Sequence, residues 1–266
     1  MLRVELGKAA HRIRTVVLGT GLAALAIIPV IVLATTSAAA DQGGPAFFSL
    51  IRHSGLIAAI AAITLVQPFF LPLGTGLLSG EAIASEASNG TLRYLVARPV
   101  GRRRLVLAKY AAVMTQLAAA IAWIGVVGLV AGVIAFGTGP LPTLSGTTLG
   151  VGAGLLRILM AAVYVLLGMS GLAAIGMFFS TITESGPGAT VATVSVAVAS
   201  QILDNISSMR VIHPYLISHR WLAFVDLFRS PVDWVGIRQG LVLDAVYTAL
   251  FLGAALLVFS RKDVVS

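Results

Sequence analysis

The chain has no cysteine and very little charge, and each shortage excludes a class of protein. Without cysteine, the chain can build neither a disulfide framework nor a thiolate metal site. Charged residues make up 11% of the 266 residues, whereas a soluble domain carries about 25%. Apolar residues make up 58% of the chain. This composition predicts an all-α integral membrane protein with room for about six spans and no large soluble domain.

Motifs for nucleotide binding and for metalloprotease chemistry are also missing. Neither the Walker A pattern nor H-E-x-x-H occurs in the sequence, so the chain has no ATP-cradling loop of that kind. Gly168 to Gly171 reads G-M-S-G in the predicted fourth span, as in rhomboid proteases, but the predicted sixth span holds no histidine base. We therefore interpret Ser170 as a small residue at a contact between helices, and we predict no catalytic residue.

Ionisable residues are scarce at the centres of the predicted spans. Arg157, Asp204 and Asp244 all fall near outer span ends, where we interpret them as interfacial or packing residues. A proton relay is therefore not predicted, and any transport needs an external source of energy. A passive channel is an alternative, because the predicted fifth span carries polar residues, although interhelical hydrogen bonds explain them equally well. These polar residues are Thr190, Thr193, Ser195, Ser200 and Gln201.

Two further kinds of site are not favoured. A metal ion shared by His213, His219 and Asp226 has little support, because a six-residue spacing between histidines has no particular meaning for ligation. Basic and aromatic residues do not form a groove-like patch, so nucleic-acid binding is not predicted despite a net charge of +8. We predict no metal site and no cofactor bound by this chain.

Hydrophobic runs organise residues 1–266 as a single transmembrane domain. A helix lying at the membrane surface is expected over residues 1–15, and one or two amphipathic helices over the outer segment 204–238. Pro68 and Pro72 predict a bend in the second span, either as tolerated packing kinks or as a hinge. The six predicted spans cover residues 16–36, 55–78, 111–136, 153–180, 189–203 and 241–260.

Basic residues predict the orientation of the chain. The first 40 residues resemble a secretory signal, but the 21 uncharged residues of 16–36 favour an uncleaved span. With the N-terminus inside, 12 of the 18 basic residues lie on the cytoplasmic side. We therefore expect a multi-pass protein of the cell membrane with both termini in the cytoplasm.

The stretch 80–110 concentrates charge between two apolar runs. It holds eight of the 28 charged residues. Burying eight charges in lipid would cost on the order of 20 kcal/mol, so segment 80–104 is expected in water between spans two and three. A turn at Gly90 and a short helix from Thr91 to Pro99 predict a structured element there. A short basic element with an apolar face is typical of a docking surface.

This stretch resembles the permease subunits of ABC transporters of the type-2 exporter class. The likeness rests on the run E-x-x-x-x-E-x-x-x-G-T-L-R-x-L-x-x-R-P-V-x-R-R-x-L-x-x-x-K, from Glu81 to Lys109. The order of six spans and the ending FSRKD, Phe259 to Asp263, are also similar to that family. By this resemblance, segment 80–104 is a cytoplasmic coupling helix seated in a separate ATP-binding subunit, which holds ATP and Mg²⁺. A second copy of the chain, or a related permease, completes the pathway.

The resemblance assigns roles to individual residues. The predicted partner-binding residues are Glu81, Glu86, Gly90, Thr91, Leu92 and Leu95. The structural motif that follows consists of Pro99, Arg102, Arg103 and Lys109. Pairing of the two glutamates with the nearby arginines is a simpler interpretation, worth under about 1 kcal/mol at an exposed site.

The predicted function is that of a permease subunit of an ATP-driven exporter. Its apolar spans favour a hydrophobic or amphipathic substrate such as a drug or a lipid. The alternative is a membrane scaffold or sensor that docks a cytoplasmic partner without transport.

Overall fold

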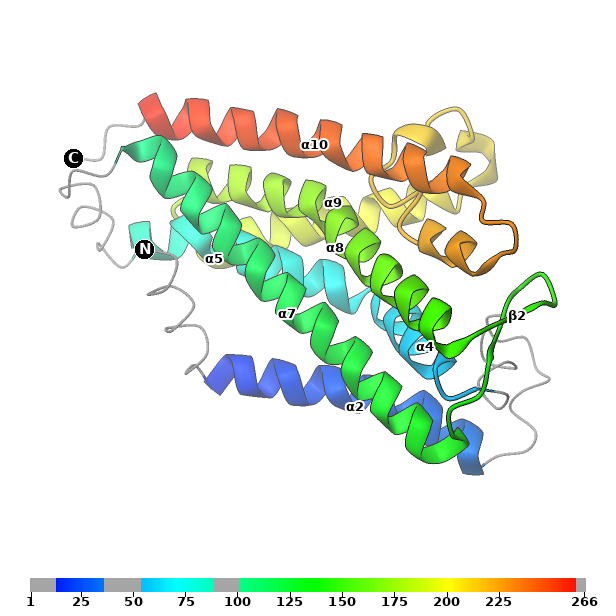
Figure 1. The fold of residues 1–266 in the computed structure, drawn as a ribbon. Coiled ribbons are helices and arrows are strands. Elements are labelled where there is room, and N and C mark those ends of the chain that lie inside the picture. The colour runs from blue at the N-terminus through cyan, green and yellow to red at the C-terminus, as the bar shows by residue number, and fades with distance from the viewer. Residues whose placement is uncertain (1–12, 36–53, 89–100, 262–266) are drawn as a thin grey trace.

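A computed structural model of the chain describes residues 13–35, 54–88 and 101–261. The surface helix predicted over residues 1–15 therefore lies almost wholly outside the described residues. Every long element is an α-helix, which confirms the all-α prediction. The long helices run between the two ends of an elongated bundle (Figure 1). The long helices are α2 (Ile13–Thr35), α4 (Ile57–Val66), α5 (Phe70–Ser88), α7 (Arg102–Phe136), α8 (Val151–Ile182), α9 (Gly186–Asp204) and α10 (Trp234–Arg261).

Several of these helices are suited to cross a membrane. Within the described ranges, α7, α8, α9 and α10 are each long and apolar enough to span it, and α4 with α5 adds a fifth span if the bent pair counts as one. Helix α2 has 23 residues and covers most of the predicted first span, 16–36.

The bend predicted from Pro68 and Pro72 is confirmed. Helices α4 and α5 are separated by residues 67–69 and meet at 59°. Proline has no N–H to donate, so a neighbouring helix has to stabilise the broken backbone. Gln201 of α9 does so, since its Nε2 donates to the carbonyl oxygen of Pro68 at 2.7 Å. The hydroxyl of Ser200 likewise lies 2.7 Å from that of Ser218. Gln201 and Ser200 of α9 thus form hydrogen bonds to the break in the second span and to the outer segment.

Three helices extend seven or more residues beyond the predicted span limits. Helix α5 continues to Ser88, past the predicted end at residue 78, and α7 begins at Arg102 instead of residue 111. Helix α10 begins at Trp234 instead of residue 241. Each predicted limit lies next to a stretch of charged or polar residues in the sequence. Arginine, lysine and glutamate are good helix formers, so the helix does not end where the hydrocarbon does.

The outer segment 204–238 differs from the prediction of amphipathic helices. Apart from the start of α10, it forms three short 3₁₀ helices, η2 (Ser207–Met209), η3 (His213–Tyr215) and η4 (Ala223–Phe228). Pro214 and Pro231 interrupt the segment, which accounts for the lack of a continuous α-helix. Its apolar side chains Phe224 and Phe228 are fully buried.

This segment forms a cap over one end of the bundle (Figure 1). Helix η4 packs against α8 and α10. A hairpin of β1 (Leu141–Pro142) and β2 (Thr148–Leu149) joins α7 to α8 beside it. The two parts are tied together because Leu144 N–H donates to the carbonyl oxygen of Phe228 at 2.9 Å.

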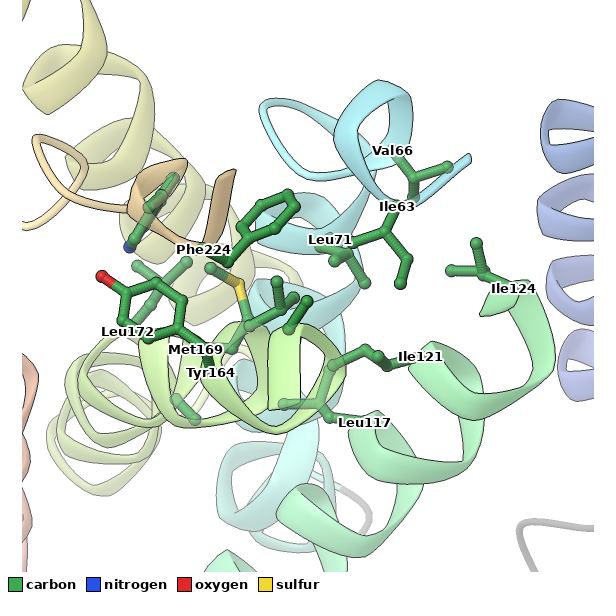
Figure 2. Packing of buried hydrophobic residues seen from close by; sticks show 14 of the residues in the cluster. Ile63, Val66, Leu71, Leu117, Ile121, Ile124, Tyr164, Met169, Leu172 and Phe224 are labelled. Carbon is green, nitrogen blue, oxygen red and sulfur yellow. The ribbon is translucent and has the colours of Figure 1, made fainter. Parts of the chain in front are cut away.

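Small residues bring α5 into close contact with α8 and α9. A Cβ placed on Gly80 would lie 2.6 Å from the backbone nitrogen of Thr190, and one on Gly176 would overlap Ser79. In lipid, where apolar surface is already solvated, such backbone proximity is a principal source of helix association. A buried apolar cluster surrounds these contacts. Figure 2 shows part of it, with Ile63, Val66, Leu71, Leu117, Ile121, Ile124, Tyr164, Met169, Leu172 and Phe224.

Two glycines of α5 test the importance of this contact. Gly80→Ala is expected to destabilise the protein by about 1–3 kcal/mol, because its methyl group meets the backbone of α9. Gly74→Ala is the matched control, since nothing lies within 4 Å of its Cβ position, and it should be neutral or stabilising by up to about 1 kcal/mol. Thermal unfolding in detergent measures both variants. Equal stability of the two variants would contradict the close approach.

Candidate partner-docking site

Five helix termini, here called the terminus cluster, meet at the end of the bundle opposite the hairpin. Helix α5 finishes there at Ser88 and α7 starts there at Arg102, while the turn between α8 and α9 lies beside them (Figure 1). The end of α10 belongs to the same group, because Arg102 Nη1 donates to the carbonyl oxygen of Ser260 at 3.1 Å. Residues 89–100 connect α5 to α7 along the chain and lie outside the described residues. The predicted docking residues Gly90, Thr91, Leu92, Leu95 and Pro99 belong to this stretch.

An ion pair joins the two helices that enter and leave the predicted docking segment. Lys109 Nζ of α7 lies 2.7 Å from Glu86 Oε1 of α5. The lysine side chain is only 6% exposed and the glutamate 21%, so the pair is largely shielded from water. The interpretation that Glu86 pairs with Arg102–Arg104 does not describe this contact. The pair instead closes a loop around residues 87–108, so that α5 and α7 are held together where the segment begins and ends.

A buried hydroxyl fixes the end of α5 against α8. Ser180 Oγ accepts hydrogen bonds from the backbone N–H groups of Ile83 and Ala84, both at 2.9 Å. Gly186, the first residue of α9, lies close to Glu81, since a Cβ there would be 3.4 Å from Glu81 Cγ. The end of α5 is thus attached to α8 and α9 by backbone-level contacts, and a displacement of this end has to move its neighbours as well.

The outer surface of the terminus cluster carries charge available to a partner. Arg103 and Arg104 are exposed in the first turn of α7, and Glu184 is exposed in the turn before α9. Among the described residues, the group of side chains that are close enough to share a metal ion lies at the other end of the bundle. The end at the terminus cluster therefore presents exposed charged side chains of both signs.

Residues singled out for their chemistry elsewhere take packing roles. Ser170 Oγ lies 3.0 Å from Thr248 Oγ1 of α10, which places Ser170 at a helix–helix contact as predicted. Arg157 Nη1 donates to the carbonyl oxygens of Leu227 and Arg229 at 2.7 and 2.8 Å and so holds the cap onto α8.

Asp244 takes the packing role, which is one of the two roles that the sequence indicated for it. Its side chain is buried at 4% exposure. Helix α10 begins seven residues earlier than predicted, so Asp244 lies ten residues inside the helix. It shares a space beside Gly168 with Trp221, and neither Asp244 Oδ1 nor Trp221 Nε1 has a hydrogen-bond partner among the described residues. A buried carboxyl group in a membrane span is the signal that marks it as functionally interesting.

The Glu86–Lys109 pair makes a testable prediction. Lys109→Met removes the ion-pair contact of the Glu86 carboxylate with α7 and should destabilise the protein by about 2–3 kcal/mol, somewhat less than for a fully buried pair. Adding Glu86→Gln to that variant should restore part of the loss. Arg104→Met, at an exposed position on the same helix, should change stability by less than about 0.5 kcal/mol. A double-mutant cycle from unfolding in detergent measures the coupling, and strictly additive effects would contradict the pair.

Comparison with known proteins adds the family. No match is found among curated proteins. A family model described as ABC-2 family transporter protein matches residues 1–185, which include the end of α5, the start of α7 and the stretch 89–100 between them. That match covers well over half of the 266 residues. The chain is therefore a member of the ABC-2 transporter family, whose members are membrane permeases.

Proposed function

We propose that the chain is the membrane-spanning permease subunit of an ATP-driven exporter. A separate subunit binds ATP and Mg²⁺ and docks on segment 80–104, and a second copy of the chain or a related permease completes the pathway. Six spans cross the cell membrane: helix α2, the bent pair α4–α5, and helices α7, α8, α9 and α10. Both termini then face the cytoplasm with the terminus cluster.

The observation that carries this proposal is the continuity of α5. The helix runs without interruption from the break at residues 67–69 to Ser88 at the terminus cluster. Its far end is linked to α7 through Glu86 and Lys109, and its middle is packed against α8 and α9 at Gly80 and Gly176. A force applied at the docking segment is therefore transmitted along a rigid rod to the centre of the membrane.

The break in the second span supports a mechanism. Helices α2, α4 and α7 pack on one another, and α5 packs mainly on α8 and α9, with α10 against α8. The backbone break at residues 67–69 lies where the chain passes from the first group to the second. Nucleotide-driven closure of the partner subunits moves the docking segment, and the second group tilts about this break between inward and outward states.

The packing of the spans supports an apolar or amphipathic substrate. A cavity of about 320 Å³ lies between α7 and α8, next to Ile63 of α4. Residues such as Ile121, Leu159 and Leu166 line it, and none of the described residues that line it is charged. A pocket with this lining accepts acyl chains or apolar rings, and it rejects ions because it offers no groups to replace their hydration.

A single apolar-to-acidic substitution tests the docking proposal. The chain is co-purified with the ATP-binding protein encoded beside its gene, and ATPase activity is measured in lipid. Leu92→Asp is expected to abolish the complex or reduce its ATPase activity at least about tenfold, since a charge in the apolar centre of an interface is costly. Val211→Asp makes the same chemical change at the opposite end, where the side chain is 84% exposed, and should have no effect.

The outcomes separate this proposal from the alternative of a scaffold without transport. Loss of the complex in Leu92→Asp alone supports the coupling role. A folded wild-type chain that binds no ATPase would overturn the exporter and favour the scaffold.

The lack of cysteine allows a direct test of the orientation. Single cysteines replace Ser88 at the terminus cluster and Val211 in the cap, and no native thiol competes for the label. In intact cells, a membrane-impermeant maleimide should label Val211→Cys, and it should label Ser88→Cys only after permeabilisation. The reverse pattern would place the terminus cluster outside the cell and would contradict docking of a cytoplasmic ATPase.

A further inference from the structure

Three side chains with metal-binding chemistry meet in the cap, far from the docking segment. Asp204 is the last residue of α9, His213 begins η3, and His219 follows a few residues later. One potential ligand atom from each lies within 4.8 Å of the other two. The sequence by itself offers Asp226 as the carboxylate that could share a metal ion with the two histidines. In the structure the carboxylate that joins them is Asp204, while Asp226 pairs with Arg229 at 2.7 Å.

The hydrogen bonding of His213 leaves one ring nitrogen facing the carboxylate. His213 Nε2 lies 3.2 Å from the carbonyl oxygen of Ile206, which can only accept, so Nε2 carries a proton in this contact. In a neutral imidazole, Nδ1 then presents a lone pair. His213 Nδ1 lies 3.8 Å from Asp204 Oδ1. Two acceptors that face each other at this distance are stabilised by a cation between them.

The hydrogen bond from His213 Nε2 to a backbone carbonyl is also typical of metal-binding histidines in proteins. Such a histidine donates its second N–H to a backbone carbonyl or a carboxylate, which fixes the tautomer and the direction of the ring. His219 supplies the third ligand, with its Nδ1 at 2.6 Å from Asp204 Oδ1. All three side chains are between 15% and 25% exposed, so the group is sheltered by the cap but reachable by an ion.

The geometry needs only small adjustments to hold an ion. Ligands at about 2.0–2.2 Å from tetrahedral Zn²⁺ lie about 3.3 Å from one another. The 2.6 Å distance between Asp204 Oδ1 and His219 Nδ1 would lengthen, and the longest distance among the three ligand atoms, at most 4.8 Å, would shorten. Each change is on the order of 1 Å for this tetrahedral arrangement. Both histidines lie on the segment between α9 and α10, where such a movement requires no change in a membrane helix.

We propose that Asp204, His213 and His219 form a site for a divalent transition-metal ion of the Zn²⁺ class. Two imidazoles and one carboxylate suit Zn²⁺ far better than Ca²⁺ or Mg²⁺, which prefer oxygen ligands alone. A bound ion ties the cap segment to the end of α9, the helix whose Gln201 bonds to Pro68 at the break in the second span. The site is independent of ATP and of the docking segment.

Metal titration of the full chain tests this site. The protein is purified in detergent with an affinity tag that contains no histidine, stripped with a chelator and titrated with Zn²⁺ against a chromophoric competitor. The wild type should bind one Zn²⁺ per chain, and Zn²⁺ should raise its unfolding temperature. His213→Ala and His219→Ala should each weaken binding at least about tenfold, because each removes a ligand. With Co²⁺ in place of Zn²⁺, the visible absorption of a low-symmetry site should appear in the wild type and be lost in both variants.

The matched control is Asp226→Asn, which removes a carboxylate from the same cap but not from the group. Its Zn²⁺ affinity should equal that of the wild type. Unfolding temperatures without metal show whether each variant is folded. Zn²⁺ binding that is absent from the wild type, or unchanged in the His213→Ala/His219→Ala double variant, or lost in Asp226→Asn, overturns the proposal. Binding that resides at His11 or His53 would be recognised by its survival in the double variant.

Discussion

The close backbone contact of α5 with α8 and α9 is the interaction on which the rest of the structure depends. In lipid, apolar side chains gain little by leaving their solvent, so helices associate where small residues let their backbones approach. Gly80 faces Thr190 and Gly176 faces Ser79 with no room for a further methyl group. These contacts set the position of α5, and α5 in turn determines where the terminus cluster and the break at residues 67–69 lie.

The polar contacts at the two ends of the bundle have different physical characters. At the terminus cluster, the Glu86–Lys109 pair and the hydroxyl of Ser180 hold helix ends together from within. At the cap, the main-chain carbonyls of Leu227 and Arg229 accept hydrogen bonds from Arg157, and Asp204 lies beside two histidines. The first arrangement makes that end of the bundle stiff. The second closes the bundle with short 3₁₀ turns whose positions depend on side-chain contacts, and it therefore suits binding of an ion.

Several polar side chains are buried among the apolar residues of the helices. Asp244 and Trp221 share a buried space beside Gly168, and Gln67 is buried in the break between α4 and α5. Burial of unpaired polar groups costs free energy, which natural proteins usually accept where a second conformation or a ligand satisfies those groups. A permease that alternates between two packings has such a second conformation, and the break at Gln67 lies where the two groups of helices meet.

Composition and local pattern determined much of this protein. The shortage of charge made it a membrane protein, the hydrophobic runs made it all-helical, and Pro68 and Pro72 placed the break in the second span. These properties follow from the sequence because each residue meets lipid, water or its own helix backbone locally. The run from Glu81 to Lys109 indicated the ABC-2 family for the same reason: its residues lie together along the chain.

Only the tertiary structure decided which side chains meet. It paired Glu86 with Lys109, chose Asp204 over Asp226 as the partner of the histidines, buried Asp244, and turned the outer segment into a cap of 3₁₀ turns. Such pairings depend on how each helix is rotated and shifted along its axis. Small residues at close contacts set that rotation and shift, and glycine, alanine and serine are too common along these spans for a sequence to show which of them touch.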